Sequence, residues 1–456
     1  MRLKFVFAHL VLLFIVIITI THFSSCTKIH LSPDPVTPVV VPTPPNLAGN
    51  PNIILILADD IGYEVPAFNG GQSYNTPNLN RMAAAGVRFT NCFAAPLSSP
   101  SRFMLTTGKY NFRNYSKWGS MNLSEVTVAN ILHSNGYATC VAGKWQFDGG
   151  DAAIKAFGYD AYCVWNAFKN GDEEEADSGS SYKDPLVYQN GAYLSADQTA
   201  GKYGVDIFNQ YVLNFIDSNR NHPFFIYYPI PIAHAPFSPT PDDEKYATWK
   251  GKRSDTSFYR SMVQYMDKMI DSVVEKVRSS GLEKNTIVLF ASDNGTPAGI
   301  ISLFKNTKVA GGMGSTTTYG THVPMIAYCP GSVTPGVCTS FVEFTDFLPT
   351  ITELANTALP AGFITDGISF RNQLFSPAYA GRSFFYNYYF PHPEYSSTLQ
   401  RQYVQDLTYK YYNAGYGFFN IVTDPDEQNK ITSTGITKEE ERIGLGFRKI
   451  IDSIHP

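Results

Sequence analysis

From residue 52 onward, short apolar runs alternate with more polar segments. Four runs are nearly continuous in apolar residues, at 52–58, 137–142, 224–230 and 286–292. Runs of this length and composition are typical of parallel strands that are buried on both faces. The pattern therefore predicts a sheet that is covered on both sides.

The segments between these runs favour helices. Residues 258–280 show apolar positions at helical spacing, and 123–134 is a second candidate helix. Strands that alternate with helices indicate an α/β fold, a large and mostly parallel sheet sandwiched by helices. The polar stretch 169–184 interrupts this alternation and is expected to be an exposed insertion or a flexible loop.

The character of the chain changes after about residue 375. Short aromatic-rich segments such as SFFYNYYF and TYKYYNAGYGFF replace the long apolar runs. They predict a smaller α+β subdomain with antiparallel strands over 376–456, beside a large domain over 51–375.

The N-terminus has the features of an export signal. Two basic residues precede an apolar run at 5–20, which is shorter than the roughly 18–20 residues that cross a bilayer. Ser24 and Ser25 then lead into Cys26, and this arrangement resembles a bacterial lipoprotein signal in which the cysteine is acylated. A signal peptide over 1–25 and lipidation at Cys26 are expected. A plain signal peptide or a marginal anchor helix is the alternative.

Residues 26–50 are rich in proline and are expected to form an extended linker. A lipid on Cys26 followed by this spacer would hold a folded domain clear of a membrane. The expected location is therefore an exported, membrane-anchored lipoprotein in the periplasm or at the cell surface.

Composition excludes several classes of protein. The formal net charge is −4 and charged residues make up 16%, so no basic surface that binds nucleic acid is expected. The six cysteines include no CxxC pair, which argues against a zinc ribbon or a thioredoxin-like redox site.

Polar residues follow each of the four predicted strands. They are Asp59 and Asp60, Lys144, His234, and Asp293 with Asn294. The carboxyl ends of strands in an open α/β sheet form the ligand site. Carboxylate and amide oxygens are hard ligands, which suit Ca²⁺ or Mg²⁺ better than zinc or copper.

Each of these residues also has a structural interpretation when it is taken alone. An aspartate after a strand often caps a helix or forms a turn, a histidine is often a buried structural residue, and a lysine is usually solvated. Their shared position at strand ends favours a site.

A serine-rich segment adds a candidate nucleophile. Pro100 is placed to open a short helix with Ser99 as its cap, and Gly108 is placed to end it. Ser98 would then lie just ahead of a helix N-terminus, which favours an anion. Arg102, one turn later, can hold an anionic substrate bidentately. An ordinary serine-capped helix is the alternative.

Together these motifs resemble the sulfatases of the alkaline-phosphatase-like superfamily. The resemblance runs from about residue 52 to about residue 429. Its signature, Cys or Ser followed by x-Pro-x-Arg and a helix that ends in Thr-Gly, is matched by Ser98, Pro100, Arg102, Thr107 and Gly108. The segments LADDIGY, AGKW and ASDNG match in order and spacing.

The resemblance implies that a maturation enzyme converts Ser98 to formylglycine, as in serine-type sulfatases. One hydroxyl of the hydrated aldehyde attacks sulfur and releases the alcohol, and the second hydroxyl then expels sulfate. Covalent catalysis of this kind divides one difficult displacement into two easier steps.

The resemblance also assigns roles to the polar residues. Asp59, Asp60, Asp293 and Asn294, together with residue 98, would bind the cation, usually Ca²⁺ rather than Mg²⁺. Arg102 would orient the formylglycine, Lys144 would contact both it and the sulfate, and His234 would lie near the leaving oxygen.

Two positions depart from the family pattern. Gln146 stands where a histidine is frequent, and Met313 stands where a second lysine is frequent. Glutamine can still hydrogen-bond the diol, although it cannot transfer a proton at neutral pH. Lys305, Lys308 or His322 could replace the missing cation near the sulfate.

The expected partner is a sulfated oligosaccharide or polysaccharide, with a sulfated aryl or steroid ester as the alternative. Tyrosines of the C-terminal region could stack on sugars or pack in the core, and His392 could point into the pocket. Two other functions stay open. One is a phosphoester hydrolase or transferase that uses unmodified Ser98, and the other is a glycan-binding protein that has lost catalysis.

Overall fold

The computed structural model describes residues 49–165, 181–250, 254–395 and 400–455. The predicted signal peptide, Cys26 and nearly all of the linker 26–50 lie outside the described residues, as does most of the stretch 169–184. Within the described residues, no helix is long and apolar enough to cross a membrane.

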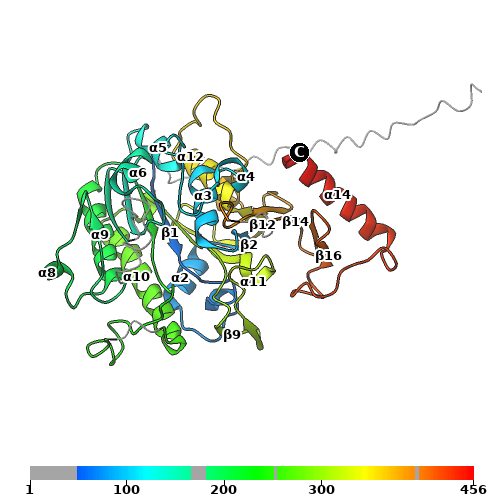
Figure 1. Cartoon of the computed structure of the whole chain (residues 1–456). Coiled ribbons are helices and arrows are strands. Elements are labelled where there is room, and N and C mark those ends of the chain that lie inside the picture. The colour runs from blue at the N-terminus through cyan, green and yellow to red at the C-terminus, as the bar shows by residue number, and fades with distance from the viewer. Residues whose placement is uncertain (1–48, 166–180, 251–253, 396–399, 456) are drawn as a thin grey trace, which may run out of the picture. The chain divides into compact units, whose positions relative to one another are not determined.

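A ten-stranded mixed sheet forms the centre of the fold (Figure 1), with the order β12-β2-β11-β8-β1-β7-β3-β4-β5-β6. Its strands are β1 (Asn52–Ala58), β2 (Val87–Phe93), β3 (Ala138–Lys144), β4 (Ala161–Trp165), β5 (Tyr188–Gln189), β6 (Ala192–Tyr193), β7 (Phe224–Pro229), β8 (Thr286–Ser292), β11 (His322–Tyr328) and β12 (Gly336–Glu343). The four predicted strands are β1, β3, β7 and β8. They are parallel neighbours in the middle of the sheet, which confirms the predicted fold class.

The two faces of the sheet carry separate cores. Along β1, Ile53, Leu55 and Leu57 join one apolar cluster, and the alternate residues join the other. This alternation follows from the period of two along a strand. A strand that is buried on both faces needs apolar residues at every position, which explains the continuous runs in the sequence.

Helices cover both cores. The first cluster packs against α3 (Ser98–Thr107), α5 (Val128–His133), α6 (Gly150–Ala156) and α12 (Phe347–Leu354). The second packs against α2 (Pro77–Ala85), α9 (Gly204–Asn219) and α10 (Tyr259–Ser279). The shorter helices are α4 (Asn111–Asn114), α8 (Ala196–Thr199), α11 (Thr318–Thr321) and α13 (Arg371–Phe375).

The predicted helix 258–280 corresponds to α10, whereas the prediction 123–134 is too long at its start. Helix α5 begins only at Val128. The side chain of Thr127 accepts a hydrogen bond from the backbone N–H of Asn130, and Oδ1 of Asn130 accepts one from the backbone N–H of Thr127. This capping box fixes the first turn and explains where the helix begins.

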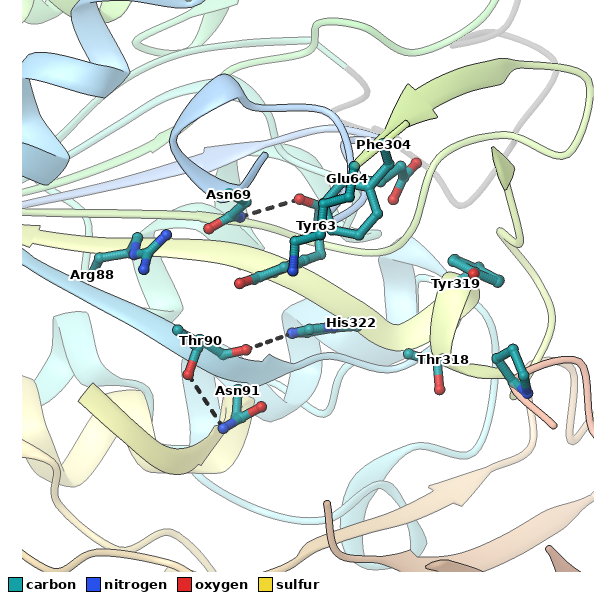
Figure 2. Close-up of a pocket in the computed structure, with 12 residues that line it drawn as sticks. Tyr63, Glu64, Asn69, Arg88, Thr90, Asn91, Phe304, Thr318, Tyr319 and His322 are labelled. Atoms are coloured by element: carbon teal, nitrogen blue, oxygen red, sulfur yellow. Dashed lines mark hydrogen bonds between the residues drawn. The ribbon is translucent and has the colours of Figure 1, made fainter. Parts of the chain in front are cut away.

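A separate hairpin, β9 (Ile301–Phe304) and β10 (Thr307–Ala310), lies outside the large sheet. Together with β2 and β11 it lines a cavity of about 620 Å³ (Figure 2). Tyr63, Phe304 and Tyr319 supply aromatic walls of this cavity.

The C-terminal region forms a four-stranded antiparallel sheet, as the sequence predicts. Its strands are β13 (Phe385–Tyr389), β14 (Arg401–Gln405), β15 (Tyr409–Tyr412) and β16 (Gly417–Asn420), in that order. Helix α14 (Lys438–Ile454) follows. A third core cluster joins this sheet to the large one through Phe93 and Phe341. The boundary at residue 375 stays a prediction.

Candidate active site

The candidate nucleophile lies in the first turn of α3. Gly108 ends the helix in the left-handed conformation, at φ 65°, and its N–H donates to the carbonyl oxygen of Met104 at 2.9 Å. The predicted stop at Gly108 is therefore confirmed.

The predicted cap is wrong. Leu97 is the residue ahead of the helix, so Ser98 is its first helical residue. The hydroxyl of Ser99 instead accepts a hydrogen bond from the backbone N–H of Gly119 at 3.2 Å. A contact with a distant segment has displaced the local capping bond that the sequence favours.

The ends of four strands deliver the other polar groups. Asp59 and Asp60 follow β1, Lys144 ends β3, His234 lies in the loop after β7, and Asp293 and Asn294 follow β8. Gly143 is required before Lys144, because a Cβ there would lie 2.1 Å from the carbonyl oxygen of Pro229. The sheet thus brings these predicted residues to one edge.

Ser98 contacts three of these residues. Its Oγ lies 3.2 Å from Oδ1 of Asn294 and 3.4 Å from Oδ1 of Asp59, and either oxygen can accept its proton. Lys144 Nζ lies 3.4 Å from the same hydroxyl and 2.9 Å from Oδ2 of Asp59. The lysine therefore lies where it can contact both residue 98 and a group bound to it.

Arg102 is fully buried behind this group. One of its terminal nitrogens lies 2.7 Å from Oδ2 of Asp293 and 3.7 Å from Oδ1 of Asp59. The other donates to the carbonyl oxygen of Lys144 at 3.1 Å. Arg102 thus positions two carboxylates and the strand that carries the lysine.

Three carboxylates share this space with two cationic side chains. Burial opposes ionisation of Asp59, but the neighbouring cationic groups, Lys144 foremost and Arg102 with it, together outweigh burial and hold the Asp59 pKa well below its usual range. Burial and the neighbouring carboxylates of Asp59 and Asp293 raise the pKa of Asp60. Burial and Asp59 also raise the pKa of Asp293. The site carries more negative charge than its own cations offset.

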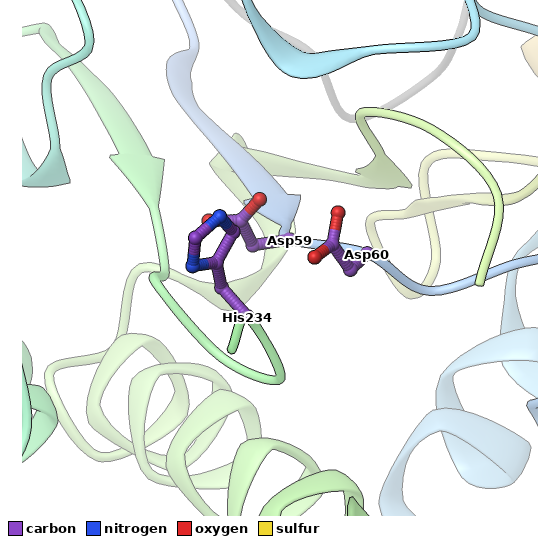
Figure 3. A group of neighbouring side chains, drawn as sticks. All are labelled: Asp59, Asp60 and His234. Atoms are coloured by element: carbon purple, nitrogen blue, oxygen red, sulfur yellow. The ribbon is translucent and has the colours of Figure 1, made fainter. Parts of the chain in front are cut away.

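The donor set fits a hard divalent cation. Asp59, Asp60 and His234 each offer a ligand atom within 4.8 Å of the others (Figure 3). Asp293 Oδ1 accepts a bond from the N–H of Asp60 at 3.2 Å, and Asn294 Nδ2 donates to Asp60 Oδ1 at 2.7 Å. Clustered carboxylate oxygens with a neighbouring amide oxygen are the ligands that Ca²⁺ uses.

His234 is held from its backbone by Tyr182. The tyrosine hydroxyl lies 2.5 Å from the carbonyl oxygen of His234 and 2.6 Å from that of Pro231. The histidine ring donates from Nδ1 to the carbonyl oxygen of Ala235, which leaves Nε2 as an acceptor in the neutral ring. Burial and the charge of Lys144 lower the pKa of His234 to about 4.

Tyr182 was missed by the sequence reasoning. It belongs to the polar stretch 169–184, which was expected to be exposed, yet Ser181 and Tyr182 are buried. The prediction of exposure is wrong at this end of the stretch. The local signal for its burial was a tyrosine among polar neighbours, because a large aromatic side chain is often buried in a core.

Gln146 is buried close to the end of β3, at 5% exposure. Its φ of 66° and that of Asp60, 62°, are uncommon for residues other than glycine. Within the described residues, Oε1 of Gln146 has no hydrogen-bond partner. Backbone strain and an unpaired buried oxygen are both features of functional positions.

The structure does not bring His322 and Lys308 to the group around Ser98. Nε2 of His322 donates to the carbonyl oxygen of Thr90 at 2.8 Å, and its ring stacks on Tyr63, in the cavity of Figure 2. Lys308 lies exposed on β10. A role for either residue in substrate binding stays a prediction. The N–H of Met313 donates to the carbonyl oxygen of Thr296 at 3.0 Å.

Comparison with protein families decides the class. The family model described as Sulfatase matches residues 51–357. The chain belongs to the sulfatase family. This sulfatase is 30% identical over 380 residues to arylsulfatase G of Rattus norvegicus, covering 73% of this chain and 70% of that protein. It is 28% identical over 348 residues to arylsulfatase A of Homo sapiens, covering 69% and 66% of the two chains.

Solved structures share the fold of this sulfatase. One is a sulfatase of Bacteroides thetaiotaomicron described with the metabolism of multiple glycosaminoglycans, at a TM-score of 0.70 and 21% identity, covering 89% of this chain and 99% of that one. Another is a complex with its substrate D-glucosamine-2-N,6-O-disulfate, at a TM-score of 0.71 and 19% identity, covering 89% and 97%. The sulfatase described here is a hydrolase of sulfuric esters.

Proposed function

We propose that this enzyme removes sulfate from a sulfated carbohydrate through a formylglycine formed from Ser98. The observation that supports this most is the position of Ser98, at the start of a buried helix and within 3.4 Å of both Lys144 and Asp59. Formylglycine supplies an aldehyde hydrate with two hydroxyl groups, one to attack sulfur and one to release the sulfate.

The proposed cation is Ca²⁺, held by Asp59, Asp60, Asp293 and Asn294 with residue 98. The excess of carboxylates and the raised pKa values of Asp60 and Asp293 support a dication in this place. A bound Ca²⁺ would lower the cost of deprotonating an adjacent hydroxyl and offset charge on sulfate oxygens.

The remaining steps belong to side chains of this chain. Lys144 lies beside Ser98 Oγ and can hold a sulfate oxygen through charge-assisted hydrogen bonds. Arg102 keeps Asp59 and Asp293 in place from behind. His234 can stabilise the leaving oxygen once a proton is on Nε2, and the negative charge of a bound sulfate favours that protonation.

The substrate class rests on the structural neighbours. Besides the glucosamine disulfate complex, a structure at a TM-score of 0.70 and 22% identity is a complex with a neocarrahexaose. These proteins bind carbohydrates, and a sulfated oligosaccharide or polysaccharide is the substrate proposed here. The names of the arylsulfatase relatives support an aryl sulfate as the alternative.

Export and anchoring complete the proposal. A lipid on Cys26 and the proline-rich segment 26–50 would place the enzyme in the periplasm or at the cell surface, where sulfated glycans arrive from outside. A maturation enzyme that accepts serine is the implied partner.

The direct test is release of sulfate from a panel of sulfated mono- and oligosaccharides by protein from the native host. Matched phosphate monoesters are assayed in parallel, and each assay is run with calcium and with a chelator. Sulfate release that requires calcium supports the proposal. Phosphate release without sulfate release would replace it by the phosphoester alternative.

A second candidate, glycan binding without catalysis, is favoured by Gln146 and Met313, which replace groups that transfer protons or carry charge in the family. Calorimetry with the same saccharides tests it. Binding that is as tight in the wild type as in Ser98→Ala, with no sulfate released by either, would favour that function.

A further inference from the structure

Three aromatic side chains stack in a row beside the candidate active site. The rings of Trp118 and His392 lie 4.9 Å apart with 19° between their planes. The rings of His392 and Tyr395 lie 5.7 Å apart at 30°. Tyr395 is 81% exposed, so the row ends in solvent. These three residues are called the aromatic ledge.

One end of the ledge is fixed to the nucleophile helix. Gly119, next to Trp118, donates its N–H to the hydroxyl of Ser99, the neighbour of Ser98. The carbonyl oxygen of Gly119 accepts a bond from the N–H of Asp148 at 2.8 Å. Trp118 is therefore attached both to the start of α3 and to the segment that follows Lys144 and Gln146.

The segment that carries His392 and Tyr395 is fixed to the same place. The hydroxyl of Tyr115 donates to the carbonyl oxygen of Pro391 at 2.7 Å, and the N–H of Trp118 donates to Glu394 at 3.4 Å. These two contacts join the segment to the loop that follows α4.

A further chain of contacts reaches the residues just before the nucleophile. The hydroxyl of Tyr389, at the end of β13, donates to the carbonyl oxygen of Gly314 at 3.3 Å. The N–H of Gly314 in turn donates to the carbonyl oxygen of Pro96 at 2.9 Å. The segment 389–395 is thus linked to both sides of Ser98. One link runs through Gly314 to Pro96, and the other runs through Trp118 and Gly119 to Ser99.

The polar groups near the ledge are suited to hydroxyl groups. The carboxylate of Glu394 lies 3.4 Å from Nδ1 of His392, at the edge of the stack. Gln146, whose buried Oε1 has no partner among the residues that the structure describes, lies in a segment packed against Gly119. A Cβ on that glycine would lie 3.6 Å from the carbonyl oxygen of Gln146. An aromatic face flanked by hydrogen-bonding groups is the usual arrangement of a ligand site.

We infer that the aromatic ledge binds a sugar ring of the substrate, so that the ring lies on Trp118 while its sulfate ester reaches residue 98. The inference rests on the proposed function and narrows it to substrates with a pyranose ring next to the ester. A pyranose presents an apolar C–H face to the aromatic ring and hydroxyl groups to Glu394. The exposed Tyr395 offers a place for a second sugar, which favours oligosaccharides over monosaccharides.

The test compares Trp118→Ala, Trp118→Phe and the wild type on two probes, a sulfated oligosaccharide that the wild type desulfates and 4-nitrophenyl sulfate. Trp118→Ala is expected to raise KM for the oligosaccharide about ten-fold, with a loss in kcat/KM at least five-fold larger than for the aryl ester. Trp118→Phe, which keeps an aromatic face, should restore most of the affinity. Tyr193→Ala, an exposed tyrosine on the edge strand β6, serves as the matched control.

Equal losses on both probes would overturn the inference, because Trp118 would then act only through Gly119 and Ser99 on the nucleophile. Unchanged kinetics on both probes would also overturn it. Calorimetry in a Ser98→Ala background keeps the two proposals distinguishable. In that background, Trp118→Ala should weaken oligosaccharide binding about ten-fold, even if the wild type releases no sulfate. Unaltered binding would contradict the inference that the aromatic ledge binds the sugar, and it would leave the proposed sulfatase function untouched.

Discussion

Arg382 and Arg102 each pair with a buried group of carboxylates in the described part of the chain. In the first, Arg382 lies 2.7 Å from Oδ1 of Asp346 and 3.1 Å from Oε1 of Glu343. Tyr110 and the N–H of Tyr386 donate to the two oxygens of Glu343. This group is completed by donors from the chain itself.

The group around Arg102 is left incomplete. It holds three carboxylates, and Asp60 accepts one side-chain hydrogen bond, from Asn294, at Oδ1. Burial and two neighbouring carboxylates raise the pKa of Asp60. A buried carboxylate without enough donors costs stability and calls for a cation.

The difference separates a structural role from a catalytic one. Both groups are buried, charged and shift the pKa values of their members, so these properties alone do not identify a site. What identifies a site is whether donors of the chain already satisfy the carboxylates. A satisfied group has no capacity for a ligand, whereas the group around Arg102 has a hydroxyl, a lysine and spare carboxylate oxygens close together.

The largest expected effect comes from Ser98→Ala. Turnover should fall by a factor of about 10⁴ or more, because the nucleophile is lost. The unfolding midpoint should change little, since the contacts of the Ser98 hydroxyl with Asp59, Asn294 and Lys144 are long, at 3.2–3.4 Å. Sulfate release and thermal unfolding measure the two quantities. Ser101→Ala, a buried serine in the same helix that donates to the carbonyl oxygen of Ala95, should keep most of the activity.

Arg382→Met should have the opposite effects, a large loss of stability and little loss of turnover. It leaves Glu343 and Asp346 buried without their cation, which is expected to lower the free energy of unfolding by about 3–5 kcal/mol. Activity per folded molecule should persist. Urea unfolding provides the measurement, and Arg81→Met, which removes a largely exposed ion pair with Asp271, should cost under about 1 kcal/mol. A small change in the free energy of unfolding for Arg382→Met would show that the group around Arg382 does not have the structural role assigned to it.

Calcium should stabilise the wild type and not Asp60→Asn. At 100 times its Kd, a ligand of the folded state adds about 2.7 kcal/mol. Without calcium, Asp60→Asn should be as stable as the wild type or more so, because it removes a carboxylate whose charge is poorly compensated. Thermal unfolding with calcium and with a chelator tests this. A control, Asp242→Asn, alters an exposed ion pair with Lys268 and should keep the response to calcium.

Another expected effect is a pH dependence of stability that originates at Glu343. Burial raises its pKa from 4.5 to about 7. The folded state therefore holds a proton that the unfolded state has lost between these values, so this residue lowers stability as pH rises from 4.5 to 7. The difference between wild type and Glu343→Gln should fall across that window by up to about 3 kcal/mol. Urea unfolding at several pH values measures it, and a flat difference would contradict the pKa shift.

The central strands and the residues at their ends could be predicted because both depend on local pattern. A strand such as β1 is apolar throughout, and parallel neighbours align their carboxyl ends, so Asp59 and Asp293 had to meet. The edge strand β6, of two residues, carries no such pattern.

Contacts between segments that lie far apart in the chain could not be predicted from the sequence. Ser99 looks like a helix cap, but the N–H of Gly119 reaches its hydroxyl instead. Tyr182 holds His234 from a stretch that was expected to be exposed. His322 lies in another cavity, although it is the first residue of β11, the strand beside β8. The position of each of these side chains depends on packing between distant parts of the fold, which a local sequence pattern does not predict.

The most direct test of the proposed mechanism is the mass of the tryptic peptide 89–102, taken from protein made in the native host. Formation of formylglycine from Ser98 removes two hydrogens, so the expected mass is about 2 Da below that of the unmodified peptide. A peptide with the full mass of serine, from protein that nevertheless releases sulfate, would contradict the proposed mechanism.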